Sequence, residues 1–111
     1  MRTPTLLGLA LRTLLPAFPG THPPPWALRL VDEGLAGFAL FGYNIVETEQ
    51  VTALTEALRS VRPDVIIATD EEGGDVTRLC YAHGSHYPGN AALGAVDDVE
   101  LTRGIYRAIG G

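Results

Sequence analysis

Residues 65–78 read V-I-I-A-T-D-E-E-G-G-D-V-T-R, an apolar run that stops at three carboxylates followed by two glycines. The apolar run at 65–68 shows no polar alternation, which is typical of a strand buried on both faces of a parallel sheet. In α/β folds ligands gather at the carboxyl ends of parallel strands, because the packed strand fixes the first residue of the following loop. We therefore expect the chemistry of this chain to lie around Asp70.

A helix and another strand precede this stretch. Apolar residues recur there at helical spacing: Val51, Leu54, Leu58 and Val61. The stripe predicts an amphipathic helix from about Thr48 to Val61, which Pro63 ends. The glycine-bounded apolar run at 37–42 predicts a strand. Strand, helix and strand form one β-α-β unit, and a right-handed crossover makes its two strands parallel.

The remaining elements are shorter. Prolines before Trp26 and a glycine at position 34 predict a short helix whose inner side carries Ala27, Leu30 and Val31. Residues 6–15 predict a first strand or a short helix, and residues 79–90 an irregular surface segment. A last helix is expected to begin near Asp97 or Asp98. Its apolar residues are expected to face inward: Leu101, Ile105, Ala108 and Ile109.

Composition narrows the class of protein. The 111 residues make one domain at most, or part of a larger one. Eight basic residues, none of them lysine, stand against thirteen acidic ones, which argues against nucleic acid or an anionic membrane as a partner. Cys80 is the only cysteine, so an internal disulfide is excluded and a cytoplasmic location fits best. The apolar residues 6–11 after Arg2 have some features of a signal peptide, but Arg12 interrupts them.

The alternation of strands and helices predicts an α/β fold with a parallel sheet. Two or three strands cannot close a barrel, and open edges expose unpaired backbone groups, so self-association through these edges is expected. The strand positions fit roughly the first three β/α units of a (β/α)8 TIM barrel, which needs about 250 residues in all.

Three segments carry a family resemblance: Gly37-Phe-Ala-Leu-Phe-Gly-Tyr-Asn-Ile45, then Asp70-Glu-Glu-Gly-Gly74 with Val76 and Arg78, then Tyr87-Pro-Gly-Asn-Ala-Ala-Leu-Gly-Ala-Val-Asp-Asp98. In this order and spacing, the chain resembles the N-terminal barrel domain of glycoside hydrolase family 3, and within it the bacterial beta-N-acetylhexosaminidase branch. Residues 1–111 would be an N-terminal fragment of that domain. The resemblance implies an O-glycosyl hydrolase acting on terminal beta-linked N-acetylglucosamine, with beta-glucosidase activity as the nearest variant. A carbohydrate is then the partner, and no cofactor or metal is implied.

The resemblance also implies roles for residues of the acidic loop. Asp70 is expected to bind sugar hydroxyls and Arg78 to line the same pocket. A carboxylate accepts two hydroxyl hydrogen bonds, and a guanidinium donates in a fixed fork. Glu72 and the pair Gly73-Gly74 are expected to shape the turn. The family often has a basic residue where this chain has Asp75, so the local field is more negative here.

The catalytic groups of the family lie beyond this segment. A retaining glycosidase needs one group that attacks the anomeric carbon and one that protonates the leaving oxygen. The resemblance assigns neither to residues 1–111, so no catalytic residue is named and the fragment alone is expected to be inactive. The alternative is a truncated, non-catalytic remnant or an interaction module that binds sugar weakly or pairs with another chain.

Other interpretations of the same residues stay open at the level of sequence. The three carboxylates are also compatible with a solvated turn or a divalent-cation site. They resemble the end of a Walker B strand as well, but no phosphate loop accompanies them. Cys80, His83 and His86 recur every three residues, which suggests zinc, although a structural site needs four ligands.

Individual side chains outside the loop carry simpler expectations. Trp26 and Phe41 are expected in the core, and Tyr43 with Asn44 at a strand end where a substrate loop is plausible. Four arginines are expected to be exposed helix charges: Arg59, Arg62, Arg103 and Arg107.

Overall fold

The computed structural model describes residues 5–111, which form two compact units, the first ending at Thr69 and the second beginning at Asp70. The elements are, in chain order, α1 (Leu6–Leu11), α2 (Pro25–Glu33), β1 (Gly37–Leu40), the 3-10 helix η1 (Gly42–Asn44), α3 (Thr48–Val61), β2 (Ile66–Thr69), α4 (Asn90–Val96) and α5 (Val99–Gly110). Each unit is described by itself below.

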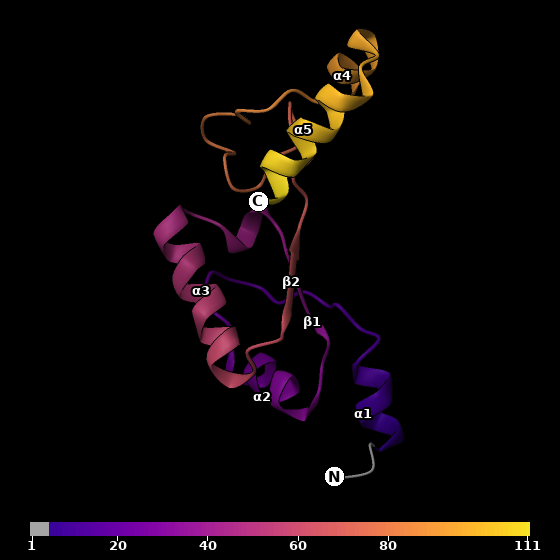
Figure 1. Ribbon diagram of the computed structural model, residues 1–111. Helices are drawn as coiled ribbons and strands as arrows, with labels where there is room; N and C mark the ends of the chain where they lie inside the picture. The colour runs from indigo at the N-terminus through magenta and orange to yellow at the C-terminus, as the bar shows by residue number, and fades with distance from the viewer. Residues whose placement is uncertain (1–4) are drawn as a thin grey trace. The chain divides into compact units, whose positions relative to one another are not determined.

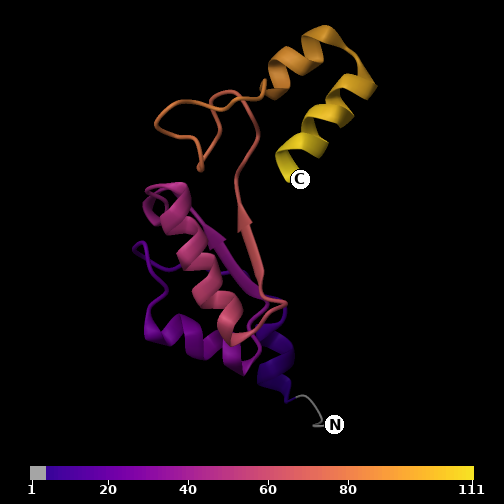
Figure 2. The same cartoon turned by 60° about the vertical axis from the view of Figure 1, so that its left-hand side comes forward.

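The first unit is an α/β structure built on two parallel strands (Figure 1). β1 pairs with β2 in a register that runs from Gly37 opposite Ile66 to Leu40 opposite Thr69. α3 connects the two strands, and both views show it alongside them (Figures 1 and 2). The predicted β-α-β unit is therefore confirmed. The expectation of about three β/α units is not met within residues 5–111, where residues 6–11 form a helix and only two strands occur.

One buried cluster joins the helices and strands of the first unit. Its members are Leu11, Phe18, Ala27, Val31, Leu35, Phe38, Leu40, Leu54, Leu58 and Val65. The rings of Phe18 and Phe38 meet edge to face at 5.0 Å between centroids. The two inner residues of the predicted α3 stripe, Leu54 and Leu58, are almost completely buried, as the spacing predicts.

Arg62 is a correction to the expected set of exposed arginines. Its guanidinium donates to the carbonyls of Val31, Leu35 and Ala36 at 2.9, 2.5 and 3.0 Å, and its Nε donates to Asp64 at 2.8 Å. Val31 lies in the last turn of α2, and Leu35 and Ala36 lie between this helix and β1, so the guanidinium sits at the carboxyl end of α2, where a cation is favoured. Arg62 therefore ties the end of α3 to the end of α2.

Three further expectations about burial are wrong. Ile66 is 51% exposed, so β2 is not buried on both faces, because within the described residues it pairs only with β1. Trp26 is 38% exposed, although its ring contacts Phe38 edge to face. Phe41 is 36% exposed because the chain leaves the strand at Leu40 and carries the ring out beyond the core.

The second unit consists of a long loop followed by α4 and α5. α4 falls in a stretch for which the sequence reading assigned no element, and α5 begins after Asp98, whose carboxylate accepts from the amide of Leu101 at 2.9 Å. No residue of α5 is buried, so the expectation that its apolar residues face inward is wrong for the described structure: Leu101 is 43% exposed. None of the helices described for residues 5–111 combines the length and the apolar character needed to cross a bilayer.

Candidate functional site

The two residues expected to contact a sugar lie close together in the second unit. Asp70 follows β2 directly in the chain, and Arg78 lies eight residues further on, beyond the turn. Arg78 Nη2 is 3.4 Å from Asp70 Oδ2, and the two side chains are 30% and 53% exposed. The pair is loose and half-exposed, so both groups have free hydrogen-bonding capacity. Arg78 Nε is buried and has no hydrogen-bond partner within the described residues.

Glu71 fixes the backbone beneath this arginine. Its Oε1 accepts from the amides of Arg78 and Leu79 at 2.6 and 2.7 Å. Charge-assisted bonds of this kind are short and roughly twice as strong as neutral ones. The family resemblance assigns Glu71 no role, and the only sign of one in the sequence is its place in the acidic loop. The structure therefore separates the carboxylates of the loop into an exposed one at Asp70 and an anchoring one at Glu71.

The two glycines form the turn between the carboxylates and Arg78, as expected. Gly73 has φ +77°, and a Cβ there would lie 2.4 Å from the carbonyl oxygen of Pro88. The amide of Gly74 donates to the carbonyl of Tyr87 at 2.8 Å. The turn thus packs against the backbone at 87–88, an approach that only glycine allows. Glu72 contributes through its amide, which donates to the carbonyl of Val76, while its side chain is exposed.

The described residues give no support to a metal site. Residues 5–111 contain no group of three or more histidine, cysteine, aspartate or glutamate side chains placed to hold one ion. His83 and His86 are exposed, and the link between Cys80 and His83 is a backbone hydrogen bond. The regular spacing of Cys80, His83 and His86 therefore does not translate into ligand geometry.

At the end of β1 the structure gives different roles to two neighbouring residues. Asn44 is completely buried, and its side chain bonds the backbone at Phe41, Phe18 and Gly20 at 2.9, 2.8 and 2.7 Å. Tyr43 is 57% exposed. Asn44 is therefore a structural residue, whereas Tyr43 is available to a ligand.

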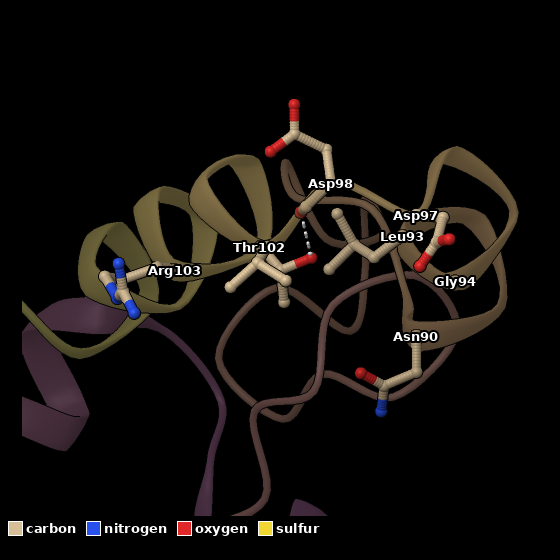
Figure 3. Close-up of a pocket in the computed structure, with 8 residues that line it drawn as sticks. Asn90, Leu93, Gly94, Asp97, Asp98, Thr102 and Arg103 are labelled. Atoms are coloured by element: carbon tan, nitrogen blue, oxygen red, sulfur yellow. Dashed lines mark hydrogen bonds between the residues drawn. The ribbon is translucent and has the colours of Figure 1, made fainter.

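A hollow of about 450 Å³ lies between α4 and α5 in the second unit (Figure 3). Asp97 and Asp98 follow one another in the turn beside it, and Thr102 donates to the Asp98 carbonyl at 2.9 Å. The Asp98 carboxylate already caps α5, and Arg103 is paired with Glu100. The polar groups at this hollow are thus engaged in holding the helices, and neither Asp70 nor Arg78 lines it.

Comparison with known sequences finds related enzymes. No protein-family model matches the chain. A beta-hexosaminidase of Neisseria gonorrhoeae (strain NCCP11945) is 37% identical over 73 residues, which are 65% of this chain and 20% of that enzyme. A beta-hexosaminidase of Pseudomonas aeruginosa (strain LESB58) is 44% identical over 45 residues, 40% of this chain and 14% of that enzyme. The matches thus span a fifth or less of these relatives.

Solved structures agree with the sequence matches. A glycoside hydrolase family 3 beta-N-acetylglucosaminidase from Paenibacillus sp. str. FPU-7 matches with a TM-score of 0.75 and 32% identity over 87% of this chain and 19% of its own. A fungal multi-domain family 3 beta-N-acetylglucosaminidase matches with a TM-score of 0.82 and 32% identity over 95% of this chain and 13% of its own. By sequence and by structure, the chain is thus similar to a part of glycoside hydrolase family 3 beta-N-acetylglucosaminidases and of bacterial beta-hexosaminidases.

Proposed function

We propose that this chain supplies part of the substrate pocket of a family 3 O-glycosyl hydrolase that removes terminal beta-linked N-acetylglucosamine. The observation that carries the proposal is the half-exposed pair of Asp70 and Arg78 in a loop anchored by Glu71. Support for the substrate class comes from relatives named beta-hexosaminidase and beta-N-acetylglucosaminidase.

The chemistry of the pair suits a sugar. Asp70 accepts hydrogen bonds from two hydroxyl groups, and Arg78 donates to a ring oxygen or an N-acetyl carbonyl from the exposed part of its guanidinium. A neutral ligand leaves the ion pair intact, whereas an anion would have to approach a loop that carries four carboxylates between positions 70 and 75.

We also propose that the two parallel strands correspond to the opening part of a (β/α)8 barrel, whose remaining units carry the nucleophile and the acid/base. The alternative is a non-catalytic module that pairs its open sheet edge with another chain. The exposed Ile66 on β2 is the observation in favour of that alternative.

A binding experiment tests the role of the pair. The ¹⁵N-labelled 111-residue chain is titrated with methyl N-acetyl-β-glucosaminide and followed by amide chemical shifts. We expect shifts at residues 70–80 with a dissociation constant of about 1 mM, the affinity of a weak complex. Asp70→Ala and Arg78→Ala are each expected to weaken binding at least tenfold, because each removes a charge-assisted bond of about 1.5–3 kcal/mol.

Asp32→Ala serves as the matched control, since Asp32 is an exposed aspartate on α2 in the other unit. It should bind the sugar like the unmodified chain. Unchanged binding by Asp70→Ala would refute the proposal, and so would a complete absence of shifts at residues 70–80.

A further inference from the structure

Two aromatic rings lie exposed just beyond the carboxyl end of β1. The rings of Phe41 and Tyr43 are stacked, with centroids 5.7 Å apart and planes inclined by 27°. Tyr43 is 57% exposed, far more than packing in a core would leave. The stack thus presents a flat aromatic surface at the edge of a parallel sheet where ligands of α/β proteins gather.

A hollow lies beside the tyrosine ring. It measures about 300 Å³ and is lined by Ala17, Phe18, Pro19 and Tyr43, all within the first unit. None of these side chains carries a charge. The hollow therefore favours the apolar face of a neutral ligand over a charged group, which would lose hydration there without an ionic partner.

Two polar side chains tie together the segments around the hollow: Asn44, which is buried, and Gln50, which is half-buried. Asn44 donates to the carbonyls of Phe18 and Gly20 in the segment before α2 and accepts from the amide of Phe41 just after β1. Gln50 repeats the connection, donating to the carbonyls of Thr21 and Asn44 at 2.7 and 3.0 Å. The site is thus preorganised, which lowers the entropy cost of binding.

We propose that the stack of Phe41 and Tyr43, with the hollow beside it, binds the ring face of a neutral sugar residue. A pyranose is flat, uncharged and lined on one face by C–H groups, which pack on aromatic rings, while its hydroxyls stay in water. The tyrosine hydroxyl adds a donor and an acceptor at the rim. This inference rests on the proposed function for the class of ligand, and it adds a second sugar-binding surface formed wholly by residues 17–43.

The test uses N,N′-diacetylchitobiose, the disaccharide of N-acetylglucosamine, titrated into the ¹⁵N-labelled 111-residue chain. We expect amide shifts at Ala17, Phe18 and residues 41–45. Tyr43→Ala should weaken this binding about tenfold, whereas Tyr43→Phe, which keeps the ring, should stay within about threefold of the unmodified chain. Far-UV circular dichroism checks that each variant keeps its fold, which the exposure of Tyr43 leads us to expect.

The outcomes separate this inference from the proposed function. Shifts at 70–80 without shifts at 41–45 overturn the aromatic site and leave Asp70 and Arg78 in their roles. Shifts at 41–45 that Asp70→Ala does not change support the aromatic site whatever happens at the loop. Shifts at 41–45 that depend on protein concentration in the absence of sugar would show that a second copy of the chain covers the rings, and they would overturn the proposal.

Discussion

One carboxylate oxygen of Glu71 accepts two short hydrogen bonds, from the backbone amides of Arg78 and Leu79. We predict that Glu71→Ala exposes the amides of Arg78 and Leu79, so that both exchange with solvent at least tenfold faster, because each bond to a charged group contributes about 1.5–3 kcal/mol. Hydrogen exchange followed by NMR measures this directly.

Glu71→Gln is the matched variant, since its amide oxygen still accepts both bonds, and it should lose much less protection. The amide of Gly74, which bonds Tyr87 instead, serves as the internal reference. Equal protection of Arg78 in all three proteins would show that Glu71 does not anchor the loop.

Asn44 fills a comparable structural role in the first unit. Asn44→Ala removes three hydrogen bonds from a completely buried side chain and leaves the amide of Phe41 without its partner. We predict a loss of about 2–4 kcal/mol in the free energy of unfolding. Urea unfolding followed by the fluorescence of Trp26, the only tryptophan, reports on this unit.

Thr52→Ala is the control for this experiment, because Thr52 is exposed on α3 and its hydroxyl bonds only a carbonyl of its own helix. Its unfolding free energy should change by no more than about 0.5 kcal/mol. A similar small change for Asn44→Ala would contradict the role assigned to Asn44.

At the scale of single residues, the sequence was a good guide to the side chains that form the candidate site. It was a poorer guide to the contacts that each side chain makes. It singled out Asp70 and Arg78, which the structure brings together, but whether they bind sugar stays a prediction. It could not show that Arg62 bonds three carbonyls or that Asn44 is buried, because both depend on segments about 25 to 30 residues away in the chain.

At the scale of elements, local signals predicted helices well. α3 has the predicted bounds because its stripe and Pro63 are both visible in the sequence. α2 begins at a proline and ends at Gly34, which adopts φ +113°, as its pattern predicts. α4 was missed because the preceding segment holds several turn-forming residues and the helix is only seven residues long.

The glycine turn of the loop provides a prediction at this scale. Gly73 and Gly84 both adopt positive φ, at +77° and +78°, but a Cβ meets backbone atoms only at Gly73. Gly73→Ala therefore adds a clash to the strain of about 1–2 kcal/mol that Gly84→Ala carries alone. We predict that Gly73→Ala abolishes exchange protection of the Gly74 amide, whereas Gly84→Ala leaves it nearly unchanged. Equal effects of the two changes would mean that the close approach to Pro88 is not required.

At the scale of the whole molecule, the described chain has an exposed strand edge. β2 pairs only with β1 among residues 5–111, and Ile66 is half-exposed on it. Unpaired edges favour association with other strands. We predict that the purified chain self-associates with increasing concentration in sedimentation velocity, and that Ile66→Lys shifts it toward monomer.

Val46→Lys is the control for this prediction, since Val46 is 72% exposed but lies outside both strands. It adds the same charge and should leave association unchanged. A chain that sediments as a monomer at every concentration would contradict association through the edge.

The central claim, that the chain provides a sugar-contacting segment of a family 3 hydrolase, can be tested in a relative that is longer. The matching segment of the Neisseria gonorrhoeae beta-hexosaminidase, 73 residues at 37% identity, is replaced by that of this chain, and hydrolysis of a chromogenic N-acetyl-β-glucosaminide is measured. We predict a folded, active chimera whose kcat/KM falls about ten- to a hundredfold with Asp70→Ala, the loss expected for one charge-assisted contact. A folded chimera without activity, or one whose rate Asp70→Ala leaves unchanged, would contradict the claim.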